Sequence, residues 1–68
     1  MIQGESELQM VERHIRDGER HVANQREIVA HLSSLGHPTE LAQRVLRNLE
    51  ELLAMHRRHL DHIQDEQS

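Results

Sequence analysis

The chain has 68 residues, a net charge of −4 with histidine neutral, and no cysteine, phenylalanine, tryptophan or tyrosine. This length allows one small domain, the lack of cysteine excludes disulfides and thiolate chemistry, and the acidic balance argues against non-specific binding to nucleic acid. A core without aromatic side chains must be aliphatic and thin, which favours helices packed on helices. The sequence therefore predicts an all-α domain over residues 1–68.

The N-terminal segment, residues 1–5, shows no basic start or apolar run that would mark a signal peptide. No later segment approaches the roughly 20 apolar residues of a membrane span. We therefore expect a cytoplasmic protein that does not act at a membrane, and we expect both ends of the chain to fray. Ser6 is suited to cap a helix that begins near Glu7, because its hydroxyl can accept from a free backbone N–H.

An apolar stripe in alternating three- and four-residue steps predicts a first helix over about residues 6–35. Its members are Leu8, Val11, Ile15, Gly18, Val22, Gln25, Val29 and Leu32. Asp17-Gly18 could instead break this segment and divide the chain into three short helices, because the dipeptide is common in turns. The stripe passes through Gly18 without a change of phase, so we favour one continuous helix.

Residues 36–38 predict a tight turn between two helices. Gly36 is suited to the left-handed position that follows a helix, and Pro38 to the first turn of the next helix. Thr39 or His37 can cap that second helix. Because the connection is short, the two helices must lie side by side and antiparallel.

The second helix is predicted over about residues 39–64, with a stripe of the same period. Its members are Ala42, Val45, Leu49, Leu52, His56, His59 and Ile63. If residues whose numbers sum to about 74 face each other across an antiparallel pair, Gly18 lies opposite His56. Gly18, Gln25 and His56 would then fix the register of the seam, and Gly18→Ala should destabilise the protein because its methyl group would meet the His56 ring.

Two apolar rows run along the predicted hairpin. The seam between the helices would consist of Val11, Ile15, Val22, Val29, Leu32, Val45, Leu49, Leu52 and Ile63. A second row consists of Ile28, Leu35, Leu46, Leu53 and Leu60. Two helices cannot cover both rows, so the second row predicts self-association into a homodimeric four-helix bundle; the alternative is a row that stays exposed. The function we expect is a small interaction or scaffold module, which an unidentified protein partner could also bind.

The chain contains seven histidines. Five of them could gather near one end of the hairpin, where imidazoles would suit zinc, nickel, cobalt or copper: His14, His21, His56, His59 and His62. The sequence has neither Glu-x-x-His nor His-Glu-x-x-His, two motifs that bind metal ions. We therefore predict that the protein holds no metal and no cofactor, and metal binding or sensing is the alternative function. A third hypothesis is an assembly that responds to pH. We expect no enzyme, because a thin aliphatic bundle rarely offers a pocket of the usual size.

Several short motifs resemble those of a group of short alphaproteobacterial helical-hairpin proteins with no established activity. They are Gly18-Glu19, Gln25, the turn Gly36-His37-x-Thr39, Ala42, and the run Leu46-x-x-x-Glu50-x-x-Leu53-x-x-His56. The resemblance extends from Glu12 to His56, about two-thirds of the chain. Members of the group often carry aspartate where Pro38 stands here, which leaves open the residue that caps the second helix. The resemblance implies a helical hairpin of bacterial origin and no particular activity.

Overall fold

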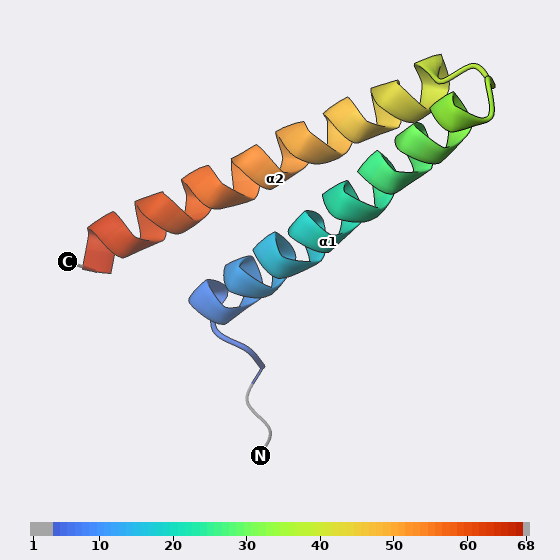
Figure 1. Ribbon diagram of the computed structural model, residues 1–68. Helices are drawn as coiled ribbons and strands as arrows, with labels where there is room; N and C mark the ends of the chain where they lie inside the picture. The colour runs from blue at the N-terminus through green and yellow to red at the C-terminus, as the bar shows by residue number, and fades with distance from the viewer. Residues whose placement is uncertain (1–3, 68) are drawn as a thin grey trace.

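The computed structural model describes residues 4–67 and shows two helices that fold back on each other as an antiparallel hairpin (Figure 1). Helix α1 spans Glu7–Ser34 and helix α2 spans Glu40–Gln67, with no strand in the described range. The predicted all-α hairpin is confirmed. Because α1 continues through Asp17 and Gly18 without interruption, the alternative of three short helices is wrong.

The start of α1 is closed by a reciprocal pair of hydrogen bonds. The backbone N–H of Gln9 donates to Ser6 Oγ over 3.1 Å, and the backbone N–H of Ser6 donates to Gln9 Oε1 over 3.0 Å. This capping box satisfies two groups that a helix end leaves unpaired, and it confirms the cap predicted at Ser6.

The residue just before the cap, Glu5, is bound to α1. Arg13 Nε donates to the Glu5 carboxylate over 3.0 Å, and this hydrogen bond lowers the pKa of Glu5. Of the frayed start expected for residues 1–5, residues 1–3 lie outside the described residues, whereas Glu5 is held by its bond to Arg13.

The end of α1 turns the chain through a glycine. His37 N–H donates to the Leu32 carbonyl and Gly36 N–H donates to the Ser33 carbonyl, both over 3.0 Å. This pair of bonds is the Schellman arrangement, which requires a left-handed residue just past the helix. Gly36 meets that requirement with φ of 73°.

The start and end of α2 differ from the prediction in small ways. Pro38 lies ahead of the helix and not in its first turn, and Thr39 stands immediately before Glu40, where α2 begins. The Thr39 carbonyl accepts the first helical bond from Gln43 N–H over 2.8 Å. The helix continues to Gln67, beyond the expected end near residue 64; Ser68 lies outside the described residues.

Burial shows that α2 is rotated relative to the predicted seam. The buried apolar side chains of the described residues are Val11 and Val22 of α1 and Leu53 and Ile63 of α2. Val45 and Leu52, which the sequence placed in the seam, are 38% and 48% exposed. Their assignment to the seam was therefore wrong, whereas the stripe on α1 faces α2 as predicted, with each member buried or half-buried.

The rotation has a simple physical cause. The predicted and observed stripes on α2 share Ala42, Leu49, His56 and Ile63 and differ at three neighbouring pairs of residues. At those pairs the observed orientation turns Leu46, Leu53 and Leu60 inward, in place of Val45, Leu52 and His59. Turning three leucines inward buries more apolar surface than a valine, a leucine and a histidine would, and it avoids burying an imidazole.

The same rotation divides the row that was predicted for self-association. Leu53 is only 6% exposed and Leu46 and Leu60 are half-buried, so these three belong to the core of the hairpin itself. Their assignment to an exposed row was wrong. Ile28 and Leu35 of α1 do face outward, with exposures of 48% and 56%.

The turn geometry predicts that Gly36→Ala lowers the stability of the protein by about 1 kcal/mol, because an alanine at positive φ is strained. The matched control is Gly4→Ala, where an added methyl group meets nothing within 4 Å and φ is not positive. Thermal unfolding followed by circular dichroism measures both variants. Equal melting temperatures for the two would contradict a left-handed turn at Gly36.

Candidate functional site

In the part of the chain that the structure describes, six large apolar side chains are exposed, and they gather on one side of the hairpin. This apolar face consists of Ile28, Leu35, Leu41, Val45, Leu52 and Met55, with exposures from 38% to 69%. His21 of α1 and Leu52 of α2 line the same cavity, so they lie on the same side of the hairpin. Residues seven apart share one side of a helix, so Ile28 and Leu35 continue the side of His21, and Val45 continues that of Leu52. Leu41 and Met55 flank this row at spacings of four and three residues.

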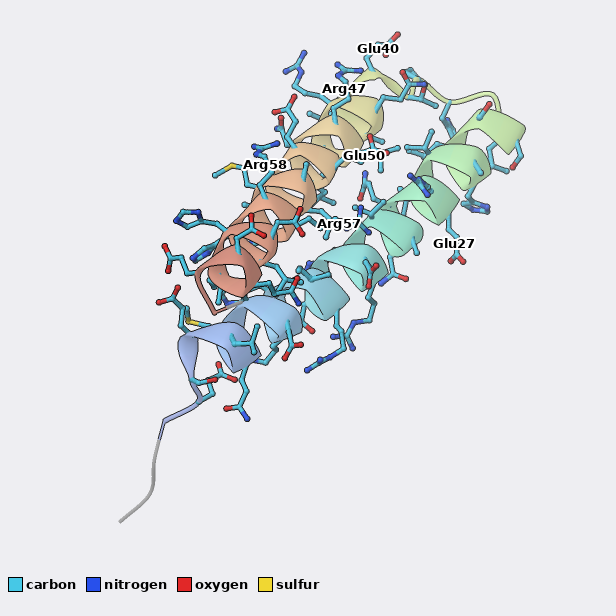
Figure 2. The ribbon with its side chains drawn as sticks, turned by 90° about the vertical axis from the view of Figure 1, so that its left-hand side faces the viewer. Glu27, Glu40, Arg47, Glu50, Arg57 and Arg58 are labelled. Atoms are coloured by element: carbon cyan, nitrogen blue, oxygen red, sulfur yellow. The ribbon has the colours of Figure 1, made fainter. Side chains whose placement is uncertain are left out.

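The opposite side of the hairpin is charged. Arg26 Nη2 lies 3.0 Å from Glu50 Oε2, and Arg57 Nη2 lies 3.0 Å from Glu19 Oε2, so two ion pairs link α1 to α2. Figure 2 shows Glu50 and Arg57 in the space between the helices. We call Glu19, Arg26, Glu50 and Arg57 the charged face; a hollow of about 380 Å³ lies beneath it. Exposed pairs of this kind contribute little stability, yet they keep this side polar.

Arginines and histidines are divided between the two sides. All eight basic residues are arginines, and in the seven-residue repeat set by the seam none of them falls on the apolar face. Five histidines do fall there. His14 and His21 lie at seven-residue steps from Ile28, and His31 lies between Ile28 and Leu35. On α2, His59 and His62 each lie seven residues after an exposed apolar residue of the face. His56 is half-buried beside them and lines the cavity. The apolar face therefore has almost no permanent positive charge but can acquire one by protonation.

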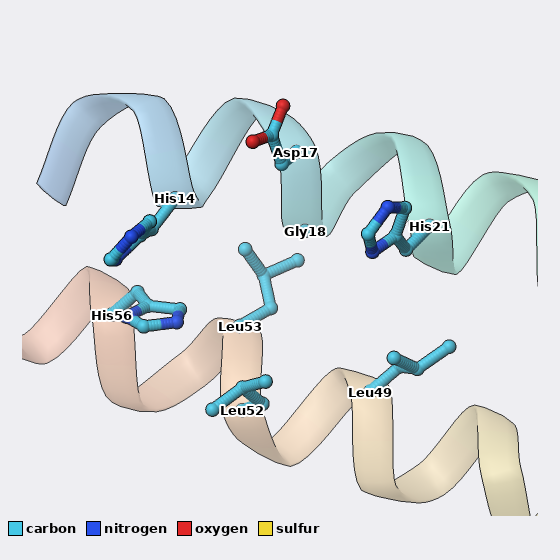
Figure 3. A pocket seen from close by; sticks show the side chains of 8 residues that line it. All are labelled: His14, Asp17, Gly18, His21, Leu49, Leu52, Leu53 and His56. Carbon is cyan, nitrogen blue, oxygen red and sulfur yellow. The ribbon is translucent and has the colours of Figure 1, made fainter. Parts of the chain in front are cut away.

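A cavity of about 220 Å³ opens in this face between the two helices (Figure 3). It is lined by His14, Asp17, Gly18 and His21 of α1 and by Leu49, Leu52, Leu53 and His56 of α2. The rings of His14 and His56 lie with their centroids 4.9 Å apart and are tilted by 50°. Figure 3 shows the Asp17 carboxylate turned away from α2, and it pairs with Arg20.

Gly18 meets Leu53 and not His56, so this part of the predicted register was wrong. A Cβ atom placed on Gly18 would lie 3.1 Å from Leu53 Cδ1, and no atom of His56 is among its three nearest neighbours. Facing residues at this level thus have numbers that sum to 71 and not to about 74. The missing side chain accommodates a leucine of the core.

Gln25 is half-buried in the seam, as predicted, but its partner is the backbone. Its Nε2 donates to the Ala42 carbonyl over 2.9 Å, which links the C-terminal half of α1 to the first turn of α2. A polar seam residue with such a bond can fix how two helices align. Its role in setting the register remains a prediction.

The five histidines proposed as alternative metal ligands are not brought together. His14, His21 and His56 line the cavity, whereas His59 Nε2 lies 3.3 Å from Glu7 Oε1 and His62 Nε2 lies 2.8 Å from Glu66 Oε1. Across residues 4–67 no group of three or more histidines and carboxylates is arranged to hold a metal ion. The structure thus gives the metal-binding alternative no support.

Over the described residues, neither helix combines the length and the apolar character needed to cross a membrane. No protein-family model, curated protein or solved structure matches the sequence. The resemblance to alphaproteobacterial hairpin proteins, with the bacterial origin it implies, stays a prediction.

The contact between Gly18 and Leu53 can be tested by a double-mutant cycle. Alanine at Gly18 gains about 1 kcal/mol of helix propensity, but its methyl group forces Leu53 Cδ1 to move by a few tenths of an ångström. We expect Gly18→Ala to change stability more favourably in the Leu53→Ala variant than in the unchanged protein, with a coupling of about 0.5–1 kcal/mol. Denaturant unfolding measures the four stabilities.

His56→Ala provides the matched control background for this cycle. No coupling is expected between Gly18→Ala and His56→Ala, because His56 is not among the nearest neighbours of the added Cβ. Coupling to His56 and none to Leu53 would restore the register predicted from the sequence.

Proposed function

We propose that the protein is a small helical interaction module that self-associates through its apolar face, so that two hairpins form an antiparallel four-helix bundle. The observation that carries the proposal is the contrast between the two sides of one hairpin. One side exposes six large apolar residues around a cavity, while ion pairs between the helices make the other side polar. A contiguous apolar surface of this kind is typical of a protein interface.

The size of the hairpin core supports the proposal. Over the described residues, the buried core of the hairpin consists of Val11, Val22, Leu53 and Ile63. This core must hold together two helices of 28 residues each, and the entropy lost in ordering every residue opposes folding. A single hairpin therefore has a small core for its length, and covering the apolar face would enlarge that core.

A second copy fits this face in size and symmetry. A helix of 28 residues is about 42 Å long, and two helices side by side are about 20 Å wide. The face thus offers about 800 Å², which is the area each partner buries in a stable dimer of standard size. A twofold axis places the same patch on both partners, so exposed leucines and valines of one copy meet those of the other. The charged faces then point outward, where they remain open to a further protein partner.

Leu52 is the residue to test, because it is half exposed and lines the central cavity. We expect Leu52→Glu to convert a dimer into a monomer, since the change would bury an unpaired carboxylate at the interface. Sedimentation equilibrium at tens of micromolar measures the mass. The matched control is Ala30→Glu, which adds the same charge at an exposed position of α1 outside the apolar face and should remain dimeric.

The unchanged protein gives the decisive comparison. A well-folded monomer at this concentration would contradict self-association. A dimer that Ala30→Glu disrupts and Leu52→Glu leaves intact would move the interface to another side of the hairpin.

A further inference from the structure

We propose that protonation of the three cavity histidines, His14, His21 and His56, controls self-association, so that the protein is dimeric at neutral pH and dissociates in mildly acidic solution. The inference rests on the proposed function, because the apolar face must be an interface for its protonation to matter. It assigns to this interface a means of regulation that depends on its own side chains.

The cavity places the three rings at the centre of the apolar face. His14 and His56 are half-buried with their centroids 4.9 Å apart, and His21 lines the same cavity from the next part of α1. The other lining groups from α2 are the apolar side chains of Leu49, Leu52 and Leu53. A second copy that covers Leu52 would also cover these rings and remove them from water.

The groups that could compensate positive charge in the cavity are few and already engaged. Asp17 is the one carboxylate that lines the cavity; it pairs with Arg20 and is turned away from α2. None of the lining residues that α2 contributes is acidic. The Glu5 carboxylate also interacts electrostatically with His14, but it is already paired with Arg13. The carboxylates nearest to three protonated rings would therefore each have a cationic partner already.

The other carboxylates on this side of the hairpin lie beside their own histidines. Glu7 Oε1 is 3.3 Å from His59 Nε2, and Glu66 Oε1 is 2.8 Å from His62 Nε2. Protonation of His59 or His62 would complete an ion pair, whereas protonation in the cavity would not. The response to pH is therefore assigned to the cavity.

The sign of the effect follows from solvation and repulsion. A neutral imidazole can be covered at small cost, whereas a charged one loses favourable hydration when it is buried. Two protonated rings in contact also repel each other. The dimer therefore binds fewer protons at these sites than the free hairpin, so lowering the pH shifts the equilibrium toward monomers. The arginines of the opposite side keep their charge throughout, so between about pH 7.5 and 5.5 the change falls mainly on the histidine-bearing side.

The test is the dissociation constant of the full chain at about pH 7.5 and about pH 5.5, measured by sedimentation equilibrium, with helicity followed by circular dichroism. We expect the constant to rise at least about tenfold at the lower pH, because histidine gains its charge within this range. The triple variant His14→Gln, His21→Gln, His56→Gln should be dimeric with the same constant at both pH values. The control His37→Gln changes the histidine of the turn, which lies outside both the cavity and the apolar face, and should keep the response.

The outcomes separate the two proposals. Equally tight dimers at both pH values would overturn the regulation and leave self-association standing. A folded monomer at both pH values would overturn self-association and the regulation with it. If the control variant loses the response and the cavity variant keeps it, the sensing groups are not those of the cavity. If the cavity variant does not fold, the unchanged protein still decides, since its own dissociation constant must rise as the pH falls.

Discussion

The contact between Gly18 and Leu53 is the constraint on which the rest of the hairpin depends. Because Gly18 has no side chain, Leu53 can approach the backbone of α1 and become almost fully buried. Residues seven apart share one side of a helix, so turning Leu53 inward also turns Leu46 and Leu60 inward. A glycine inside a helix costs about 1 kcal/mol relative to alanine, and the close approach of a core leucine offsets that cost.

The orientation of α2 then determines which chemistry each side of the molecule presents. With Leu53 in the seam, Val45 and Leu52 point outward beside Ile28 and Leu35 and form an apolar surface. The same rotation places Glu50 and Arg57 where they can pair with α1 on the opposite side. One helix phase thus accounts for the exposed apolar residues, for the ion pairs between the helices, and for the separation of histidines from arginines.

Local signals in the sequence were sufficient to predict the helices but not their relative rotation. The cap at Ser6, the left-handed turn at Gly36 and the continuity through Gly18 each depend on a few neighbouring residues, so the sequence predicted them correctly. The orientation of α2 about its own axis was ambiguous, because the residue just before each of Leu46, Leu53 and Leu60 fits a stripe of the same spacing. Two signals could have resolved it: the burial of Leu60 in place of His59, and the opposite charges of the Glu19–Arg57 and Arg26–Glu50 pairs. The cavity and its paired rings depend on that rotation and were therefore missed.

The central claim is that Leu53, and not Leu52 or His56, faces Gly18 across the seam. Nuclear Overhauser effects between side chains and the α protons of Gly18 report this contact directly, because they require distances below about 5 Å, comparable with the spacing of side chains that pack together. The structure predicts strong effects from the Gly18 α protons to the Leu53 methyl groups, since a Cβ on Gly18 would lie 3.1 Å from Leu53 Cδ1. Strong effects to the ring protons of His56 or the methyl groups of Leu52, with none to Leu53, would contradict the orientation of α2 and the apolar face that follows from it.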